Sequence, residues 1–137
     1  MSVPKDSRKE SKLALAVLAR EHATYVIQIT KNPKNFDPAY RTALTDDLIK
    51  SAKDIYHYIW AANNVMVRSK EDYANRRSYQ KKAILMCNTL IADMEVAQSV
   101  FHISGKRMRY WAAMVVEIRN KTRAWIESDA VRYIAYR

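Results

Sequence analysis

The segment between Ser69 and His102 constrains the fold more than any other part of the chain. It contains neither glycine nor proline. Its core-facing positions recur at intervals of three and four, which is the spacing of one face of an α-helix. These positions are Tyr73, Gln80, Ala83, Ile84, Cys87, Leu90, Ile91, Met94, Ala97 and Phe101. The pattern predicts one helix of about 45–50 Å, which must bury its apolar face against other long elements.

Capping residues mark both ends of this helix. Ser69 is a good N-cap, and two acidic residues in the first turn suit the positive end of the helix dipole. The helix is expected to end at about His102, before the only glycine of the chain. Ser104 or Gly105 then opens a last helix, and residues 128–137 either extend it or form a docked tail. Its apolar face comprises Met108, Trp111, Ala112, Val115, Ile118, Thr122, Trp125 and Ile126.

A first helix is predicted from about Ser11 to Thr30, with two neighbouring stripes at helical spacing. One stripe comprises Leu13, Val17, Arg20, Thr24 and Ile27. The other comprises Leu15, Leu18, His22, Val26 and Ile29.

The second helix has two alternative starts. Asp37 precedes Pro38, so an N-cap carboxylate is followed by proline at the first helical position. The start nearer Thr42 is the alternative, and the helix is expected to end at about Val65 or Met66. Its core positions are Leu44, Leu48, Ala52, Ile55, Ile59 and Ala62.

Turn residues are too scarce for a β-rich fold, because the 137 residues include one glycine and three prolines. A chain of this length forms one domain, and 49% hydrophobic residues are enough for a real core. Short connections between long helices favour an all-α fold, an antiparallel up-down-up-down four-helix bundle. The bundle is expected over residues 11–137, after a flexible tail at residues 1–10.

Catalytic and metal-binding patterns are not apparent. His22, His57 and His102 lie apart, without the spacing of a helical metal site. His22 sits on an apolar stripe, which is more typical of a core histidine. Cys87 lies in the buried ladder, where a thiol is a poor nucleophile. We therefore expect no enzyme, no metal and no cofactor.

Compartment follows from what the sequence lacks. The first ten residues have no apolar core of the kind that secretory signals carry. No stretch reaches the roughly 18 apolar residues of a membrane span. The chain is therefore expected to be cytoplasmic, without a membrane partner.

Positive charge is the most informative functional feature, with a net charge of +10. Such an excess in a small chain favours an anionic partner such as nucleic acid. Three clusters stand out, and in an antiparallel bundle the first and third are expected to meet at one end, where phosphates would bind. The clusters are Arg76, Arg77, Lys81 and Lys82; Lys106, Arg107 and Arg109; and Arg119, Lys121 and Arg123. Arg132 and Arg137 add charge at the C-terminus.

Aromatic residues suggest two further roles. Tyr73, Tyr79 and Trp125 lie near the first and third clusters and either stack on bases or pack in the core. Tyr56, Tyr58 and Trp60 span most of the circumference of the second helix, which indicates an oligomer or partner interface. Tyrosine rings lying along a wet surface are the alternative. For the whole chain, the alternative to nucleic-acid binding is a protein-only helical scaffold that binds an acidic protein partner.

The chain resembles the accessory variability determinant (Avd) proteins of diversity-generating retroelements. These belong to a larger four-helix-bundle superfamily that includes proteins encoded in intervening sequences of ribosomal RNA genes. The resemblance covers about residues 36–133 and rests on diffuse motifs. These are Ala62 and Asn63 closing the second helix, the arginine-rich start of the third, and a "W…V…I…W" pattern in the fourth.

The resemblance implies a function without chemistry. Avd subunits assemble as a homopentamer with a basic surface, and they bind a reverse transcriptase and RNA that contains the template repeat and spacer. The complex makes mutated cDNA that replaces a variable repeat, a process called mutagenic retrohoming. On this chain the RNA-binding role is carried over to the basic positions at the start of the third helix and along the fourth.

Overall fold

The computed structural model describes residues 5–137, and it describes side chains from residue 13 onward. Four α-helices make up most of this part, and it contains no strand. They are α1 (Lys5–Ile29), α2 (Asp46–Asn63), α3 (Lys70–Phe101) and α4 (Gly105–Arg132). Three short segments complete the path, a 3-10 turn η1 (Pro38–Tyr40), a π-helical segment η2 (Arg41–Thr45) and a 3-10 turn η3 (Ile134–Tyr136). The predicted all-α class is confirmed.

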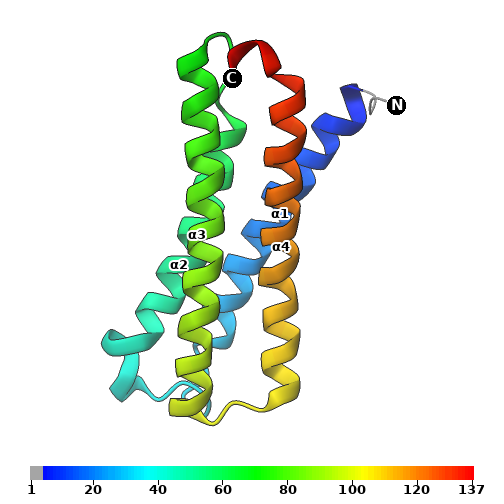
Figure 1. Ribbon diagram of the computed structural model, residues 1–137. Coiled ribbons are helices and arrows are strands. Elements are labelled where there is room, and N and C mark those ends of the chain that lie inside the picture. The colour runs from blue at the N-terminus through cyan, green and yellow to red at the C-terminus, as the bar shows by residue number, and fades with distance from the viewer. Residues whose placement is uncertain (1–4) are drawn as a thin grey trace.

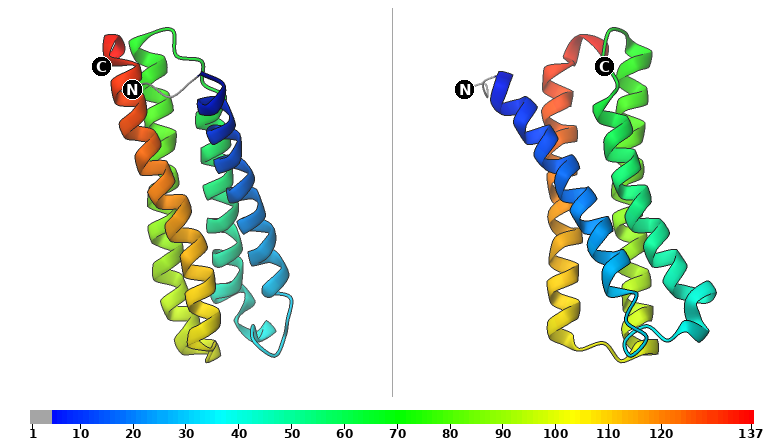
Figure 2. Two further views of the ribbon diagram at one scale, coloured as in Figure 1. Left: turned by 90° about the vertical axis from the view of Figure 1, so that its right-hand side faces the viewer. Right: turned by 180° about the vertical axis from the view of Figure 1, so that it is seen from behind.

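The four helices lie lengthwise against one another as a helical bundle (Figures 1 and 2). α2 packs against both α1 and α3, while α4 packs against α3 and α1. The α1–α2 connection and the α3–α4 connection lie at one end of the molecule, which is the lower end in Figure 1. The α2–α3 connection and the C-terminus lie together at the other end. α1 crosses the bundle at an angle, and its first turns diverge from α4 (Figure 2).

The helix limits around α3 are set by the predicted caps. The Ser69 side chain accepts a hydrogen bond from the Asp72 amide at 3.0 Å, and Ser104 accepts one from the Arg107 amide at 3.2 Å. His102 ends α3 in the left-handed region at φ 54°. The prediction of one uninterrupted helix over this segment is confirmed.

The ends of the other helices differ from the predictions. α1 begins at Lys5 rather than Ser11; part of the predicted flexible tail, residues 1–4, lies outside the described residues. Asp37 does act as an N-cap, with Oδ1 accepting from the Ala39 amide at 2.9 Å. The structure it caps is η1, and regular α-helix begins only at Asp46. α4 continues to Arg132, so the last residues extend this helix and then turn through η3.

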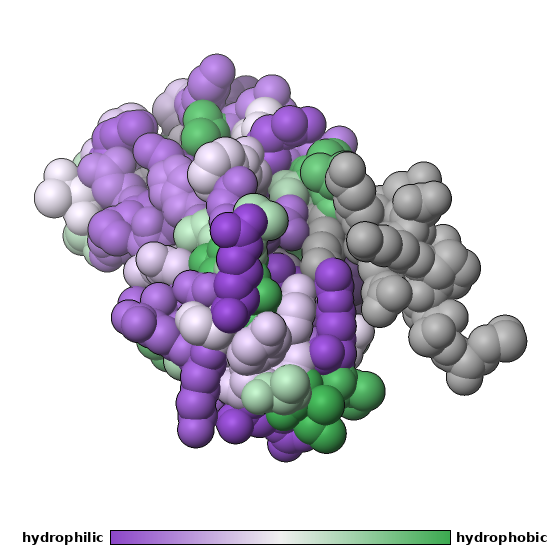
Figure 3. Space-filling view, turned by 90° about the horizontal axis from the view of Figure 1, so that it is seen from above, coloured by the Kyte–Doolittle hydropathy of each residue, from purple (hydrophilic) through white to green (hydrophobic). Residues whose placement is uncertain are grey.

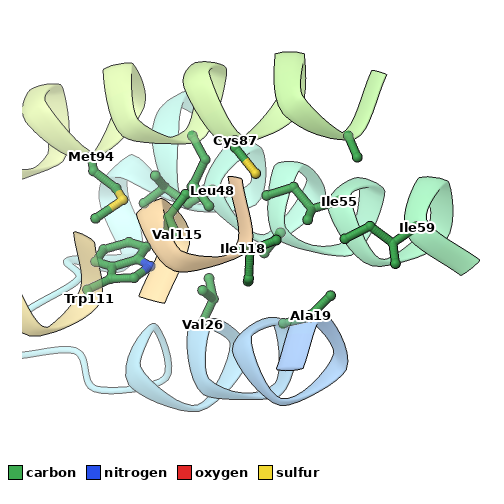
Figure 4. Close-up of a cluster of buried hydrophobic side chains, with 14 of the residues drawn as sticks. Ala19, Val26, Leu48, Ile55, Ile59, Cys87, Met94, Trp111, Val115 and Ile118 are labelled. Atoms are coloured by element: carbon green, nitrogen blue, oxygen red, sulfur yellow. The ribbon is translucent and has the colours of Figure 1, made fainter. Parts of the chain in front are cut away.

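The core runs along the axis of the bundle and receives side chains from all four helices (Figure 4). The ladder predicted for α3 supplies Ala83, Cys87, Leu90, Met94 and Ala97. Of the two stripes predicted for α1, the one containing Leu15 and Val26 faces this core. The other stripe is exposed at Leu13, Val17 and Ile27.

A histidine and a tryptophan form a polar contact inside this core. Trp111 Nε1 donates to His22 Nε2 at 3.2 Å. His22 is fully buried, and its Nδ1 has no hydrogen-bond partner among the described residues. Burial lowers the pKa of His22 to about 4, so the imidazole is neutral near pH 7. This arrangement matches the predicted core histidine.

Among the described residues, α3 is long and apolar enough by composition to cross a membrane. A single helix of this kind is a weak indication, because a helix that packs in a protein core meets the same criteria.

Candidate nucleic-acid interface

One side of the bundle, where α3 packs against α4, carries four basic side chains. The register of the two helices is fixed where Arg119 Nη1 donates to Asn88 Oδ1 at 2.9 Å. Lys81 and Arg77 precede Asn88 by seven and eleven positions, about two and three helical turns, so they lie on the same face of α3. Arg123 follows Arg119 by one turn on α4. We call Arg77, Lys81, Arg119 and Arg123 the α3–α4 basic flank.

The charge of this flank is not neutralised by neighbouring acids. Four ion pairs occur in the part of the chain that the structure describes, and none includes a residue of the flank. Lys81 and Arg123 are exposed, while Arg77 and Arg119 are half-buried and held by side-chain hydrogen bonds. Four cations from two helices therefore present a surface on which phosphates can replace bound counterions.

Arg76 does not belong to this surface, so its prediction as a nucleic-acid contact is wrong. Its side chain is only 3% exposed. The guanidinium forms a two-pronged pair with Asp129, with Nε–Oδ2 at 2.7 Å and Nη2–Oδ1 at 3.1 Å. Gln80 Nε2 also donates to Asp129 Oδ2, at 2.8 Å. The charge of Arg76 is thus compensated inside the bundle, because a buried charge requires a partner.

This buried network ties together one end of the molecule. The Arg76 guanidinium carbon lies 5.0 Å from the ring centroid of Trp125 and 5.5 Å from that of Tyr133. Its Nη1 also reaches the Val65 carbonyl at 3.5 Å. The network therefore joins the α2–α3 connection, α3 and the C-terminal end of α4.

Asp129 was missed by sequence reasoning, although a signal for the network existed. Gln80 was assigned to the core-facing ladder of α3, and Arg76 precedes it by one helical turn. A cation and an amide in successive core positions require a buried acceptor. Asp129 lies at a core-facing position of α4, seven residues after Thr122.

Lys82 lies on the opposite flank of α3, toward α2. Its Nζ is 5.9 Å from the ring centroid of Tyr58 and 5.7 Å from that of Tyr79. Of the three aromatic residues predicted as possible base-stacking groups, Tyr73 and Trp125 are buried. Tyr79 alone remains half-exposed.

The remaining predicted cations lie away from the α3–α4 basic flank. Lys121 follows Arg119 by only two positions, which points it to another side of α4, and it pairs with Glu117 at 3.1 Å. Lys106, Arg107 and Arg109 begin α4 at the opposite end of the bundle (Figure 1). The first and third clusters were expected to meet as a whole. Only two residues from each cluster lie on the shared flank.

The end of the molecule where α3 begins and α4 ends is visible in Figure 3. Hydrophilic side chains cover most of the coloured surface there, with smaller apolar patches between them. Arg132 and Arg137 belong to this end. Arg132 lies over the Tyr133 ring at 5.0 Å, and Arg137 Nη1 donates to the Ala130 carbonyl at 3.4 Å.

The aromatic residues of α2 divide into two groups. Tyr56 and Tyr58 are half-buried and pack against the core. Trp60 is 54% exposed. Of the predicted interface residues, Trp60 is thus the one whose apolar surface is mainly uncovered.

Groups suited to metal binding do not cluster in the described part of the chain. No three His, Cys, Asp or Glu side chains come together there in a way that would hold a metal ion. Burial raises the pKa of the Cys87 thiol to about 12 despite the nearby positive charges of Arg119 and Arg123. This thiol is therefore not a nucleophile near neutral pH.

Comparisons of the chain with protein-family models, with curated proteins and with solved structures find no match.

Proposed function

We propose that this chain is a non-catalytic, cytoplasmic accessory protein of a diversity-generating retroelement. It binds the reverse transcriptase and its template RNA and supports mutagenic cDNA synthesis. The observation that carries the proposal is the α3–α4 basic flank, where four cations from two helices have no ion-pair partner in the described residues. The sequence resemblance over residues 36–133 supports the retroelement setting.

Phosphate binding on this flank does not require recognition of the base sequence of the RNA. Each lysine or arginine that neutralises a phosphate releases a condensed counterion, and this release drives association. Arg77 and Arg119 are positioned by their hydrogen bonds to Tyr73 and Asn88, at 2.9 Å in both cases. Because these two side chains are already held in place, they lose little conformational freedom when a phosphate binds.

The proposal includes a finer architecture. The four helices form an antiparallel up-down-up-down bundle, and several copies assemble as a homopentamer. The opposite order of the contacts between α3 and α4 supports the antiparallel arrangement, since Arg76 meets Asp129 whereas the later Asn88 meets the earlier Arg119. The exposed Trp60 supports a contact between copies.

RNA affinity measured across a salt series tests the proposal. Binding should weaken with salt with a log–log slope of about −0.7 for each phosphate neutralised on a single strand. The double variant Lys81→Glu, Arg123→Glu should weaken all RNA sequences alike and reduce the magnitude of the slope. The matched control Lys31→Glu, Lys34→Glu makes the same charge change at exposed positions of the α1–α2 connection. A flat slope, or equal losses in the two variants, would rule out the α3–α4 basic flank as the binding surface.

A protein-only scaffold is the second candidate function. Three apolar side chains are exposed on the outer side of α3: Leu85, Val96 and Val100. They cannot bind a phosphate backbone, so this surface suits a protein partner instead. Negligible RNA binding, together with capture of a neighbouring gene product that persists in high salt, would favour this function over the first.

A further inference from the structure

We propose that Tyr58, Tyr79 and Lys82 form a stacking site for a base of a single-stranded nucleic acid. The site lies on the flank of α3 that faces α2, so it is separate from the α3–α4 basic flank. This inference rests on the proposed function and deepens it. It gives the chain a preference for single strands over duplexes, which phosphate contacts alone do not provide.

The two rings are held in a nearly parallel arrangement. Their centroids are 6.5 Å apart and their planes meet at 26°. Both tyrosines are half-buried and pack against the core at one side. The rings are therefore positioned before any ligand arrives, while part of each remains in contact with solvent. A rigid, partly exposed aromatic surface is what base stacking requires, because every base has a π-face.

A cation completes the site. Lys82 is exposed, and its Nζ lies within 6 Å of both ring centroids. Asp54 precedes Tyr58 by one turn of α2 and is the nearby acid on that side of the helix. Its carboxylate is already paired with Lys50 at 2.7 Å. The hydrogen bond to Asp54 raises the pKa of Lys50, so this ammonium stays charged beside Asp54. Lys82 thus remains available to a phosphate next to the stacked base.

A strand can pass from this site to the α3–α4 basic flank across one helix. Lys81 and Lys82 are adjacent in sequence but point to opposite flanks of α3, and Ser78 between these flanks is exposed. A single strand that crosses α3 here places one base on the tyrosines and its next phosphates on Lys81 and Arg123. A duplex keeps its bases stacked inside the helix, so it reaches only the cations.

The site is tested with a labelled single-stranded RNA and the duplex of the same sequence. Tyr79→Leu retains apolar packing but removes the aromatic face. It should weaken single-strand binding about 5- to 160-fold, the range for loss of one base–aromatic stack, with the salt slope and duplex affinity unchanged. Tyr79→Phe should bind as the wild type does. The control Tyr110→Leu removes a tyrosine of α4 that is 63% exposed and should have no effect.

Three further measurements make the assignment specific. Lys82→Gln should make the negative salt slope for single strands shallower, by about 0.7 in magnitude. A 4-thiouridine strand should photocrosslink to the tryptic peptide that contains Tyr79. Single-stranded DNA should lose affinity in Tyr79→Leu as RNA does, because stacking does not involve the 2′-hydroxyl.

The outcomes separate this inference from the proposed function. If Tyr79→Leu and Tyr58→Leu bind single strands as well as the wild type while Lys81→Glu, Arg123→Glu binds weakly, the stacking site is overturned and the phosphate surface stands. A loss as large for the duplex as for the single strand also overturns the site, since it indicates a general defect. If the wild-type chain binds no nucleic acid, both proposals fall.

Discussion

At the residue scale, two basic neighbours on α3 have different environments. Arg76 and Arg77 are adjacent, yet Arg76 is buried against Asp129 and Arg77 lies on the α3–α4 basic flank. Adjacent helical positions are about 100° apart around the axis, so their side chains point to different sides of the helix. A cluster that is contiguous in sequence therefore divides between the core and two flanks of the same helix.

Removing one member of the buried pair should be costly. Arg76→Met leaves the Asp129 carboxylate buried without its cation and should lower the free energy of unfolding by about 3–5 kcal/mol. Arg76→Met combined with Asp129→Leu should cost much less than the sum of the single changes, because no uncompensated charge remains. Urea unfolding of the four proteins in the cycle gives the coupling. Additive effects would show that the ion pair does not act as a unit.

His22 should make the fold sensitive to acid. Its pKa is lowered from 6.5 to about 4 in the folded chain, so between these values the unfolded state binds more protons. Stability is therefore full above pH 6.5 and falls as the pH drops toward 4, by about 3 kcal/mol at 1.36 kcal/mol per pH unit. Unfolding free energies of the wild type and His22→Leu should differ in their pH dependence by this amount. Parallel curves would contradict the assignment.

At the scale of elements, α3 has three distinct sides. One side supplies the core, one faces α4 with Arg77 and Lys81, and one faces α2 with Tyr79 and Lys82. The long helix was predictable because its apolar period and its Ser69 cap are local features. Which neighbour each flank faces was not, since that depends on the packing of distant segments.

The Asp37–Pro38 signal near the start of α2 correctly indicates a helical turn, but this turn is not the first turn of α2. Asp37 and Pro38 form the N-cap and first position of a helical turn, as their chemistry requires. That turn is a 3-10 turn, and a π-helical segment follows before the α-helix begins at Asp46. Leu44 and Thr45 are buried in this segment, so packing rather than capping determines the local winding.

At the scale of the whole molecule, the proposed homopentamer needs a contact between copies, and the exposed Trp60 is the residue proposed for it. Light scattering should give a mass near five times the 16.0 kDa of one chain. Trp60→Glu should reduce this mass, because a charge within an apolar contact is left without a partner. Tyr110→Glu on α4 is the matched control and should leave the mass unchanged. A wild-type monomer would contradict both the pentamer and the Trp60 contact.

The sequence by itself determined the helical class, the length and caps of α3, and the excess of positive charge. These depend on periodicity, capping and composition, which act within a few turns of chain. Only the tertiary structure decided which cations lie on the surface and which are paired inside the bundle. It buried Arg76 by supplying Asp129 from 53 positions away, and it brought Arg77 and Lys81 beside Arg119 and Arg123. The free energy of a charge depends on what surrounds it, and those surroundings come from other helices.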